Sequence, residues 1–259
     1  MMNSLWIAKT GMSAQQTNLD VISHNLANVS TTGFKRNNAV FEDLIYQNLR
    51  QVGSNTTEQT QLPTGLHLGL GVRTVATTRN FSQGTLQETK KDNDLAINGA
   101  GFFQVQLPDG TTGYTRDGSF SLDSTGQMVN SSGYPLTDGI TRAASAVKAT
   151  VGSNGLVTFF NSAGTAVGTG QLNLANFINP AGLEPIGQNL YRESVASGNP
   201  QTGAPQSGSF GEIKQGFLEG SNVNVVEELV TMIQAQRAYE MNSKAIQTSD
   251  QMLAKLAQL

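Results

Sequence analysis

Few side chains in this sequence could perform acid–base, nucleophilic or metal-binding chemistry. It contains two histidines, His24 and His67, and no cysteine. His24 falls in a stretch with helical periodicity and His67 in one that alternates like a strand, so both are explained as ordinary helix or strand residues. A metal site from two separated histidines would need carboxylate ligands that the sequence does not identify. The absence of cysteine excludes disulfides, thiolate zinc sites and cysteine nucleophiles.

Glycine-rich and acidic stretches also match no catalytic or cofactor motif. The glycines of residues 65–71 are followed by no Lys-Ser/Thr pair, so they do not form a phosphate-binding loop. Asp92 and Asp94 lack the remainder of a calcium-binding loop, including its sixth-position glycine. There is no nucleophile elbow and no metalloprotease helix motif. We therefore predict a protein that is not an enzyme, with no catalytic, metal-binding or cofactor-binding residues and no small-molecule substrate.

The composition narrows the class of protein further. Charged residues make up 14% of the 259 residues, against about 25% in a typical soluble domain. The net charge of −3 gives no basic surface for nucleic acid, which excludes a nucleic-acid partner. Hydrophobic residues, at 37%, are too frequent for a wholly disordered chain, and no apolar run reaches the roughly 20 residues of a membrane span. Neutral polar residues replace the missing charge.

The first thirty residues have the pattern of a long helix. Apolar residues recur every seven positions, and a second set follows three residues behind, as in a coiled-coil seam. The first set is Leu5, Met12, Leu19 and Leu26, and the second contains Ala8, Gln15, Ile22 and Val29. Asn3 or Ser4 could cap the start, and Gly33 suits a left-handed cap at the end. The pattern predicts a helix of about 26 residues, which would be about 40 Å long.

The last thirty-five residues repeat this design. The seven-residue spacing is carried by Val225, Met232, Tyr239, Ile246 and Leu253, and Leu229 and Ile233 widen the apolar stripe. Asn224, with Glu227 three positions later, resembles a capping box and should begin the helix. Glutamine, asparagine, serine and threonine are frequent on the other faces, and we expect charge to be sparse on both helical ends. Such faces suit helices that pair with each other and then pack against further copies.

The middle of the chain reads as antiparallel β structure. Short β-branched and aromatic runs alternate with turn signals such as Asn98-Gly99 and Asp117-Gly118, and helical crossovers are lacking. The predicted fold class is therefore α+β. Residues 1–33 and 218–259 form a terminal coiled-coil domain, and residues 85–204 form an outer antiparallel β domain. Residues 34–84 and 205–217 form an irregular, extended connecting segment with a hairpin-like arm at 46–65.

Three segments identify a family. Residues 25–36, which read Asn-Leu-Ala-Asn-Val-Ser-Thr-Thr-Gly-Phe-Lys-Arg, closely resemble the N-terminal signature of bacterial flagellar rod and hook proteins. Residues 221–244 resemble the C-terminal signature of that family, and residues 101–120 resemble its shared core. The motif residues are Asn25, Asn28, Thr32, Gly33, Phe34, Ser221, Asn222, Val223, Gln236, Arg237 and Tyr239.

Within the family, one segment distinguishes the subgroups. Residues 46–65 are similar to the insertion that separates the distal rod members from the hook protein and is linked to a straight, stiff filament. Its marker residues are Tyr46, Gly53, Leu62, Pro63 and Gly65. The resemblance therefore implies a structural subunit of the distal rod. A hook or proximal rod protein of the same family is the alternative.

The resemblance implies a straight, rigid, hollow helical tube that transmits motor torque to the hook and carries the export channel. Its terminal helices would line the channel, with the seam residues Leu5, Met12, Leu19, Ile22, Leu26, Val29, Val225, Leu229, Met232, Ile233, Tyr239, Ile246 and Leu253 as the assembly interface. The implied partners are further copies, the proximal rod proteins, the hook protein, the P-ring and L-ring proteins, and the rod cap during assembly.

The implied location is the basal body, as a periplasmic rod that extends to the outer membrane. Export would use the flagellar type III system, which agrees with a start that lacks the features of a Sec signal peptide. An adhesin with coiled-coil ends would show a Sec signal and a repeated stalk, and neither is visible. A peptidoglycan hydrolase would need a paired acid and base that the carboxylates do not form.

Overall fold

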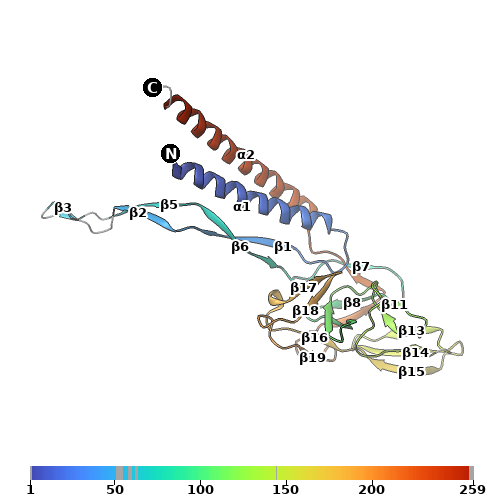
Figure 1. The fold of residues 1–259 in the computed structure, drawn as a ribbon. Helices are drawn as coiled ribbons and strands as arrows, with labels where there is room; N and C mark the ends of the chain where they lie inside the picture. The colour runs from blue at the N-terminus through green and yellow to red at the C-terminus, as the bar shows by residue number, and fades with distance from the viewer. Residues whose placement is uncertain (1, 51–54, 58–59, 62–63, 144, 257–259) are drawn as a thin grey trace. The chain divides into compact units, whose positions relative to one another are not determined.

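The computed structural model describes residues 2–50, 55–57, 60–61, 64–143 and 145–256. They form two structural units (Figure 1). The first, here called the helix-and-arm unit, comprises Met1–Leu26, Asn37–Thr78 and Asn224–Leu259. The second, here called the β unit, comprises Ala27–Arg36 and Arg79–Val223. Both units therefore combine segments from distant parts of the chain.

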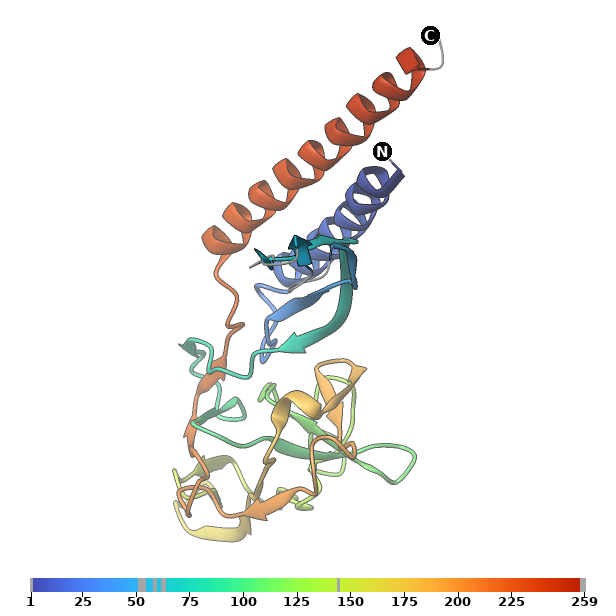
Figure 2. The ribbon, with the colours of Figure 1, turned by 90° about the vertical axis from the view of Figure 1, so that its left-hand side faces the viewer.

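Two long helices dominate the helix-and-arm unit. Helix α1 spans Met2–Ala27 and α2 spans Val225–Leu256, close to the lengths that the periodicity predicts. They run antiparallel, so that the N-terminus and the C-terminus lie at the same end of the unit (Figure 2). A Cβ atom added at Gly11 would lie 3.0 Å from Nδ2 of Asn242, which shows how closely the two helices approach.

The predicted cap begins α2 as expected, whereas the caps predicted for the two ends of α1 do not bound that helix. Asn224 caps α2: its Oδ1 accepts a hydrogen bond from the Val226 amide at 3.1 Å. Asn3 and Ser4 lie inside α1, so the prediction that either caps it is wrong. Gly33 has the expected positive φ of +67°, but α1 ends six residues earlier. Gly33 therefore does not cap α1.

An arm made of three successive pairs of antiparallel strands completes this unit. Its strands are β1 (Asn37–Asp43), β2 (Tyr46–Arg50), β3 (Asn55–Thr57), β4 (Thr60–Gln61), β5 (Leu66–Gly69) and β6 (Val72–Arg79). They pair as β1 with β6, β2 with β5 and β3 with β4. The expectation of an irregular segment is therefore wrong for the described residues of 37–79 that lie in these strands. The Val72 amide donates a hydrogen bond to the Thr10 hydroxyl at 3.3 Å, so the arm lies along α1.

The β unit consists of small antiparallel sheets. Its strands are β7 (Leu86–Glu88), β8 (Leu95–Asn98), β9 (Phe103–Gln106), β10 (Thr112–Thr115), β11 (Ser121–Leu122), β12 (Met128–Val129), β13 (Lys148–Val151), β14 (Leu156–Phe160), β15 (Ala166–Gln171), β16 (Leu174–Asn176), β17 (Glu184–Gly187), β18 (Leu190–Arg192), β19 (Gln201–Gly203), β20 (Glu212–Gln215) and β21 (Phe217–Glu219), with a 3₁₀ helix at Pro180–Gly182. The largest sheets have the orders β17-β18-β10-β9 and β13-β14-β15. This confirms the predicted strand-rich centre.

Two hydrophobic clusters stabilise the β unit. The larger contains Leu95, Phe103, Val157 and Ile213, all essentially inaccessible to solvent. The smaller is aromatic, with Phe102 and Tyr114 in edge-to-face contact with Phe177. Strand β20 pairs with β8 and buries Ile213 in the larger cluster, so residues 205–217, expected to be irregular, contain a strand of this core.

Candidate assembly interface

A buried ion cluster lies where the N-terminal and C-terminal signature segments meet in the β unit. Lys35 Nζ lies 2.7 Å from Glu219 Oε1, and both side chains are completely inaccessible to solvent. Arg116 Nη1 lies 3.3 Å from the other carboxylate oxygen, Oε2. Two cations thus share one anion inside the protein. Such an arrangement is stable where hydrogen bonds satisfy most of the remaining polar atoms. Arg116 Nε is buried without a hydrogen-bond partner, whereas the other donors and acceptors described below are paired.

Backbone groups supply most of those hydrogen bonds. Lys35 Nζ donates to the carbonyl of Ser82 at 2.7 Å, and the Gly84 amide donates to Glu219 Oε1 at 2.9 Å. Arg116 Nη2 donates to the Gly99 carbonyl at 2.8 Å. Burial lowers the pKa of Lys35, while Glu219 acts in the opposite direction and Arg116 adds to the lowering. Burial also lowers the pKa of Arg116, again opposed by Glu219.

Asn222 ties the same segments together through its side-chain amide. Its Oδ1 accepts a hydrogen bond from the Arg36 amide at 2.8 Å. Its Nδ2 donates to the carbonyls of Asn80 and Ser82 at 2.9 and 3.1 Å and to the Ser82 hydroxyl at 3.0 Å. One side chain therefore joins three segments that are far apart in the sequence.

Gly33 makes a close backbone approach that a larger residue could not make. Its amide donates to the Glu219 carbonyl at 2.8 Å. A Cβ atom at this position would lie 2.6 Å from the Asp117 nitrogen, inside any normal contact distance. The family glycine is therefore required both by its left-handed backbone and by this approach.

In the helix-and-arm unit, Asn25 links α1 to the arm and to α2. It exchanges two hydrogen bonds with the Asn37 backbone, at 2.8 and 2.9 Å, in the manner of a strand pair. The same amide lies 3.5 Å from Glu228 Oε2. Asn25 and Glu228 are both 1% exposed, so these contacts are fixed inside the unit.

The structure places the predicted seam residues in differing environments. On α1, Ile22 is buried, and Leu5, Met12, Leu19 and Leu26 are half-buried, as is Val29 just after the helix. On α2, Met232, Ile246 and Leu253 are half-buried, whereas Val225, Leu229, Ile233 and Tyr239 are exposed. The buried positions are mostly small or polar: Ala8, Ala14, Asn25, Glu228 and Ala235. Large apolar side chains therefore remain available on the outer faces.

The remaining predicted residues are distributed over both units. Phe34 and Val223 are buried, Asn28, Thr32 and Ser221 are half-buried, and Gln236 and Arg237 are exposed. In the arm, Tyr46 is exposed and Gly65 is half-buried, while Gly53, Leu62 and Pro63 lie outside the described residues. The sequence patterns did not predict that Lys35, Arg116 and Glu219 form an ion cluster. Lys35 and Arg116 nevertheless lie within residues 25–36 and 101–120, which resemble the family signature and core.

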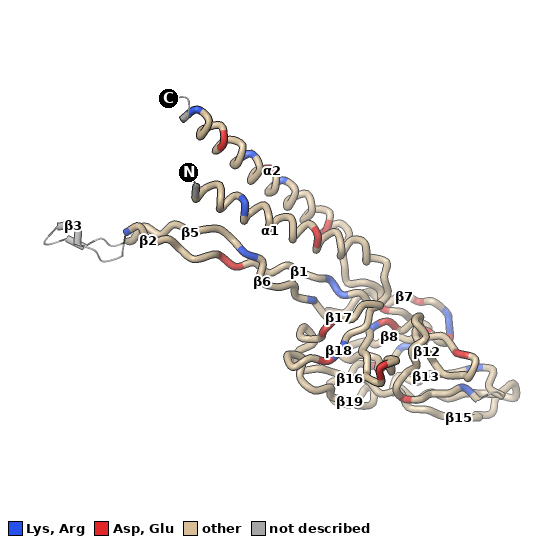
Figure 3. Tube along the Cα trace, in the orientation of Figure 1, with Lys and Arg blue, Asp and Glu red and all other residues tan. Residues whose placement is uncertain are grey.

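The distribution of charge differs between the two helices (Figure 3). Helix α1 carries only Lys9 and Asp20 among Lys, Arg, Asp and Glu, as expected. Helix α2 carries seven such residues, so the expectation of sparse charge is wrong for this helix: Glu227, Glu228, Arg237, Glu240, Lys244, Asp250 and Lys255.

Within the described part of the chain, no helix is long and apolar enough to cross a membrane, and no group of three acidic, histidine or cysteine side chains could hold a metal ion.

Three family models match this chain. They are described as the flagella basal body rod protein, over residues 5–35, the flagellar hook protein FlgE/F/G D1 domain, over residues 96–159, and the flagellar basal body rod FlgEFG protein C-terminal, over residues 214–259. Residues 25–35 and 219–222, which meet in the contacts above, fall within the first and last of these matches.

Three relatives that match along nearly their whole length carry the same name. The chain is 57% identical to flagellar basal-body rod protein FlgG of Buchnera aphidicola subsp. Schizaphis graminum, over 100% of both chains. It is 48% identical to the FlgG protein of Borreliella burgdorferi, over 98% of this chain and 97% of the relative. It is 39% identical to the FlgG protein of Bacillus subtilis, over 100% and 99%.

Proposed function

The chain belongs to the flagellar basal-body rod protein family, and on this premise we propose how it assembles. It is a structural subunit of the flagellar distal rod and not an enzyme. Its place is the basal body of the flagellum. The proposal is that copies build a straight, rigid, hollow helical tube that transmits torque to the hook and encloses the export channel.

The observation that carries this proposal is an apolar stripe on α2. Val226, Leu229, Val230 and Ile233 recur at helical spacing and are between 43% and 69% exposed. Exposing such a stripe to water is unfavourable by about 25 cal/mol per Å². A neighbouring copy would cover it, and a contact between unlike surfaces, repeated about an axis, generates an open helical assembly.

Substitution on the stripe tests the assembly. The variant Val230→Ser/Ile233→Ser should remain monomeric at concentrations where the unmodified chain forms straight tubes in electron micrographs. The control Gln234→Ser/Gln247→Ser changes two exposed polar positions of the same helix and should assemble normally. Normal tubes from the first variant would contradict the proposal.

We also propose that α1 and α2 form a coiled coil within each copy. Gly11 with Asn242 and Asn25 with Glu228 fit one antiparallel register. Because the chain has no cysteine, Gly11→Cys/Asn242→Cys can test this by disulfide formation in the monomer. Ser13→Cys/Asn242→Cys, with an exposed position on another face of α1, is the control and should not close. Equal closure in both would reject the register.

The arm is proposed to stiffen the tube by bridging neighbouring copies. Support comes from its apolar side chains Tyr46, Leu49, Leu66 and Leu68, which remain between 44% and 56% exposed. Deletion of residues 46–65 should leave tubes that form but curve. Straight tubes after the deletion would contradict this role.

The proposed assembly as a distal rod also includes export by the type III system. It further includes contacts with the proximal rod, hook, P-ring, L-ring and rod-cap proteins.

A further inference from the structure

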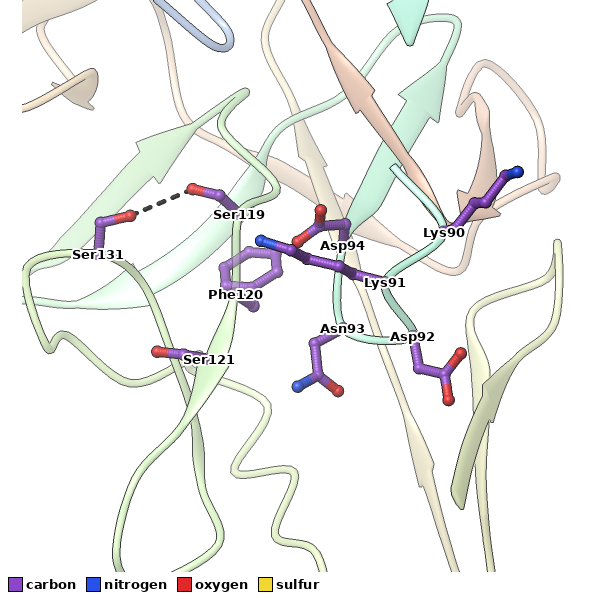
Figure 4. A pocket seen from close by; sticks show the side chains of 9 residues that line it. All are labelled: Lys90, Lys91, Asp92, Asn93, Asp94, Ser119, Phe120, Ser121 and Ser131. Carbon is purple, nitrogen blue, oxygen red and sulfur yellow. Dashed lines mark hydrogen bonds between the residues drawn. The ribbon is translucent and has the colours of Figure 1, made fainter. Parts of the chain in front are cut away.

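The charged hollow on the β unit that Figure 4 shows requires no ligand to balance its charges. The Lys91 ammonium lies beside the Asp94 carboxylate, so the two charges offset each other. The hydroxyls of Ser119 and Ser131 lie 3.2 Å apart, within hydrogen-bond distance. Reactive side chains that remain accessible lie instead on α2, in the form of two methionines.

These two methionines differ from the others in their exposure. Among the methionines whose side chains the structure describes, only Met241 and Met252 are exposed, at 67% and 55%. Met12 and Met232 are half-buried, and Met128, in the β unit, is 5% exposed. Because access to the sulfur limits its oxidation, Met241 and Met252 should react first with a dissolved oxidant.

Both exposed methionines lie on the face of α2 that points away from α1. They are eleven residues apart, and Val230 precedes Met241 by another eleven, a spacing close to three turns of an α-helix, so the three form one row. Glu228 Oε2 lies 3.5 Å from the side-chain nitrogen of Asn25 on α1. Val230 follows Glu228 by two residues, or about 200° around the helix axis. The row therefore extends the apolar stripe proposed above as an assembly contact.

Conversion of a methionine to its sulfoxide requires only a two-electron oxidant such as a hydroperoxide. The sulfur lone pair attacks one peroxide oxygen, so that an S–O bond forms while the O–O bond breaks. The proton passes to the departing oxygen, which leaves as water or an alcohol; the sulfur is oxidised and the peroxide is reduced. The sulfoxide is polar, and it disrupts apolar interfaces that contain methionine.

We propose that Met241 and Met252 form a paired oxidation site, which hydroperoxides modify in the unassembled chain and which then prevents assembly. This inference rests on the proposed function, because it takes the outer face of α2 to be covered by a neighbouring copy in the tube. Covering a sulfoxide oxygen without a hydrogen-bond donor is unfavourable. In assembled tubes the same contact shields both sulfurs, so the modification acts before assembly.

Tryptic mass spectrometry of the peroxide-treated monomer tests the site itself. Each methionine whose side chain is described falls on its own tryptic peptide: Met12 on 10–35, Met128 on 117–142, Met232 on 215–237, Met241 on 238–244 and Met252 on 245–255. After brief treatment with dilute hydrogen peroxide, the sulfoxides of Met241 and Met252 should form at least about fivefold faster than that of Met128. A smaller difference at either position would overturn the assignment of the site.

Electron microscopy of the same samples tests the effect on assembly. The concentration at which the full chain forms tubes should rise at least about tenfold after treatment. Each variant is compared with its own untreated sample. Met241→Leu/Met252→Leu keeps apolar side chains that cannot be oxidised, so treatment should change its tube formation little. The control Met128→Leu retains both exposed methionines, so treatment should block its assembly as in the unmodified chain.

Tubes that form equally well from the treated and untreated unmodified chain would overturn the proposal, as would equal sensitivity of Met241→Leu/Met252→Leu. If that variant forms no tubes before treatment, reduction of the treated unmodified chain by methionine sulfoxide reductases replaces it and should restore tubes. Continued failure after reduction would also overturn the proposal. If the untreated unmodified chain forms no tubes, the proposed function fails and the effect on assembly fails with it, while mass spectrometry still decides the site.

Discussion

Neutralising Glu219 should destabilise the β unit more than any substitution of its two cationic partners. In Glu219→Gln, one oxygen becomes an NH₂ group, which cannot accept the hydrogen bond now made by Arg116 or Lys35. Both cations would remain buried without an anion. Breaking a buried ion pair by removing one partner costs about 3–5 kcal/mol. For a unit of this size, each kcal/mol lowers the melting temperature by about 2–4 °C, so a fall of about 6–20 °C is expected.

The variant Lys35→Met should be milder, because Glu219 and Arg116 would remain as a neutral pair. The Ser82 carbonyl, which Lys35 now binds, keeps its hydrogen bond from Asn222. We expect a loss of about 1–2 kcal/mol for the hydrogen bonds that disappear. The ranking of the two variants is therefore a stronger test than either value alone.

Urea unfolding, followed by near-ultraviolet circular dichroism of the tyrosines, measures both changes in the full chain. The control is Glu184→Gln, which breaks the pair of Glu184 with Arg192 at 2.9 Å, where both side chains are about half exposed. It should change the unfolding free energy by no more than about 0.5 kcal/mol. The reasoning is refuted if Glu219→Gln costs less than about 1 kcal/mol, or if Lys35→Met costs as much.

Three other predictions concern the same unit. Gly33→Ala should lower the unfolding free energy by more than about 2 kcal/mol, because the added Cβ would collide with the backbone. Gly110 has φ +81° but open space around it, so Gly110→Ala should lower the unfolding free energy by about 1 kcal/mol. Equal losses of unfolding free energy in urea would contradict this. Asn222→Ala should cost about 2–4 kcal/mol, since four hydrogen bonds disappear, and a calorimetric change below about 1 kcal/mol would be inconsistent with them. Burial raises the pKa of Tyr114 to about 12, so the folded state keeps a proton that the unfolded state loses above pH 10. The melting temperature should therefore fall between pH 10 and 12. Tyr114→Phe should reduce this fall relative to the unmodified chain.

The two helices could be predicted because their apolar spacing is a local property of the sequence. What the spacing did not reveal is which neighbour covers each face. Buried positions such as Ala14 and Ala235 are small, while the larger Leu229 and Ile233 remain exposed. Counting large apolar residues identifies the helix face whose burial would release the most free energy. It does not distinguish contacts within one chain from contacts between chains.

Residues 34–84 were predicted to be irregular apart from a hairpin-like arm at 46–65, and the reason that most of their strands were not foreseen is equally physical. Strand β6 is exposed along almost its whole length, and β2 is exposed throughout. Alternation of apolar and polar residues arises when one face of a sheet is buried and the other meets water. A ribbon exposed on both faces imposes no such alternation, so its sequence resembles that of a polar linker.

The ion cluster could not have been derived from spacing, because Lys35 and Glu219 are 184 positions apart. Its position explains what it contributes to the fold. Strand β21 pairs Glu219 with Leu86 of β7. A slip of one residue along this pairing would turn Glu219 to the opposite face and leave both cations buried without an anion. Apolar side chains of similar volume could stabilise this site as well, and a slip would turn them outward too, but it would leave no buried cation without an anion. We therefore expect the charge on Glu219 to raise the cost of a slip in β21, and so to help fix the point at which the chain leaves the β unit toward α2.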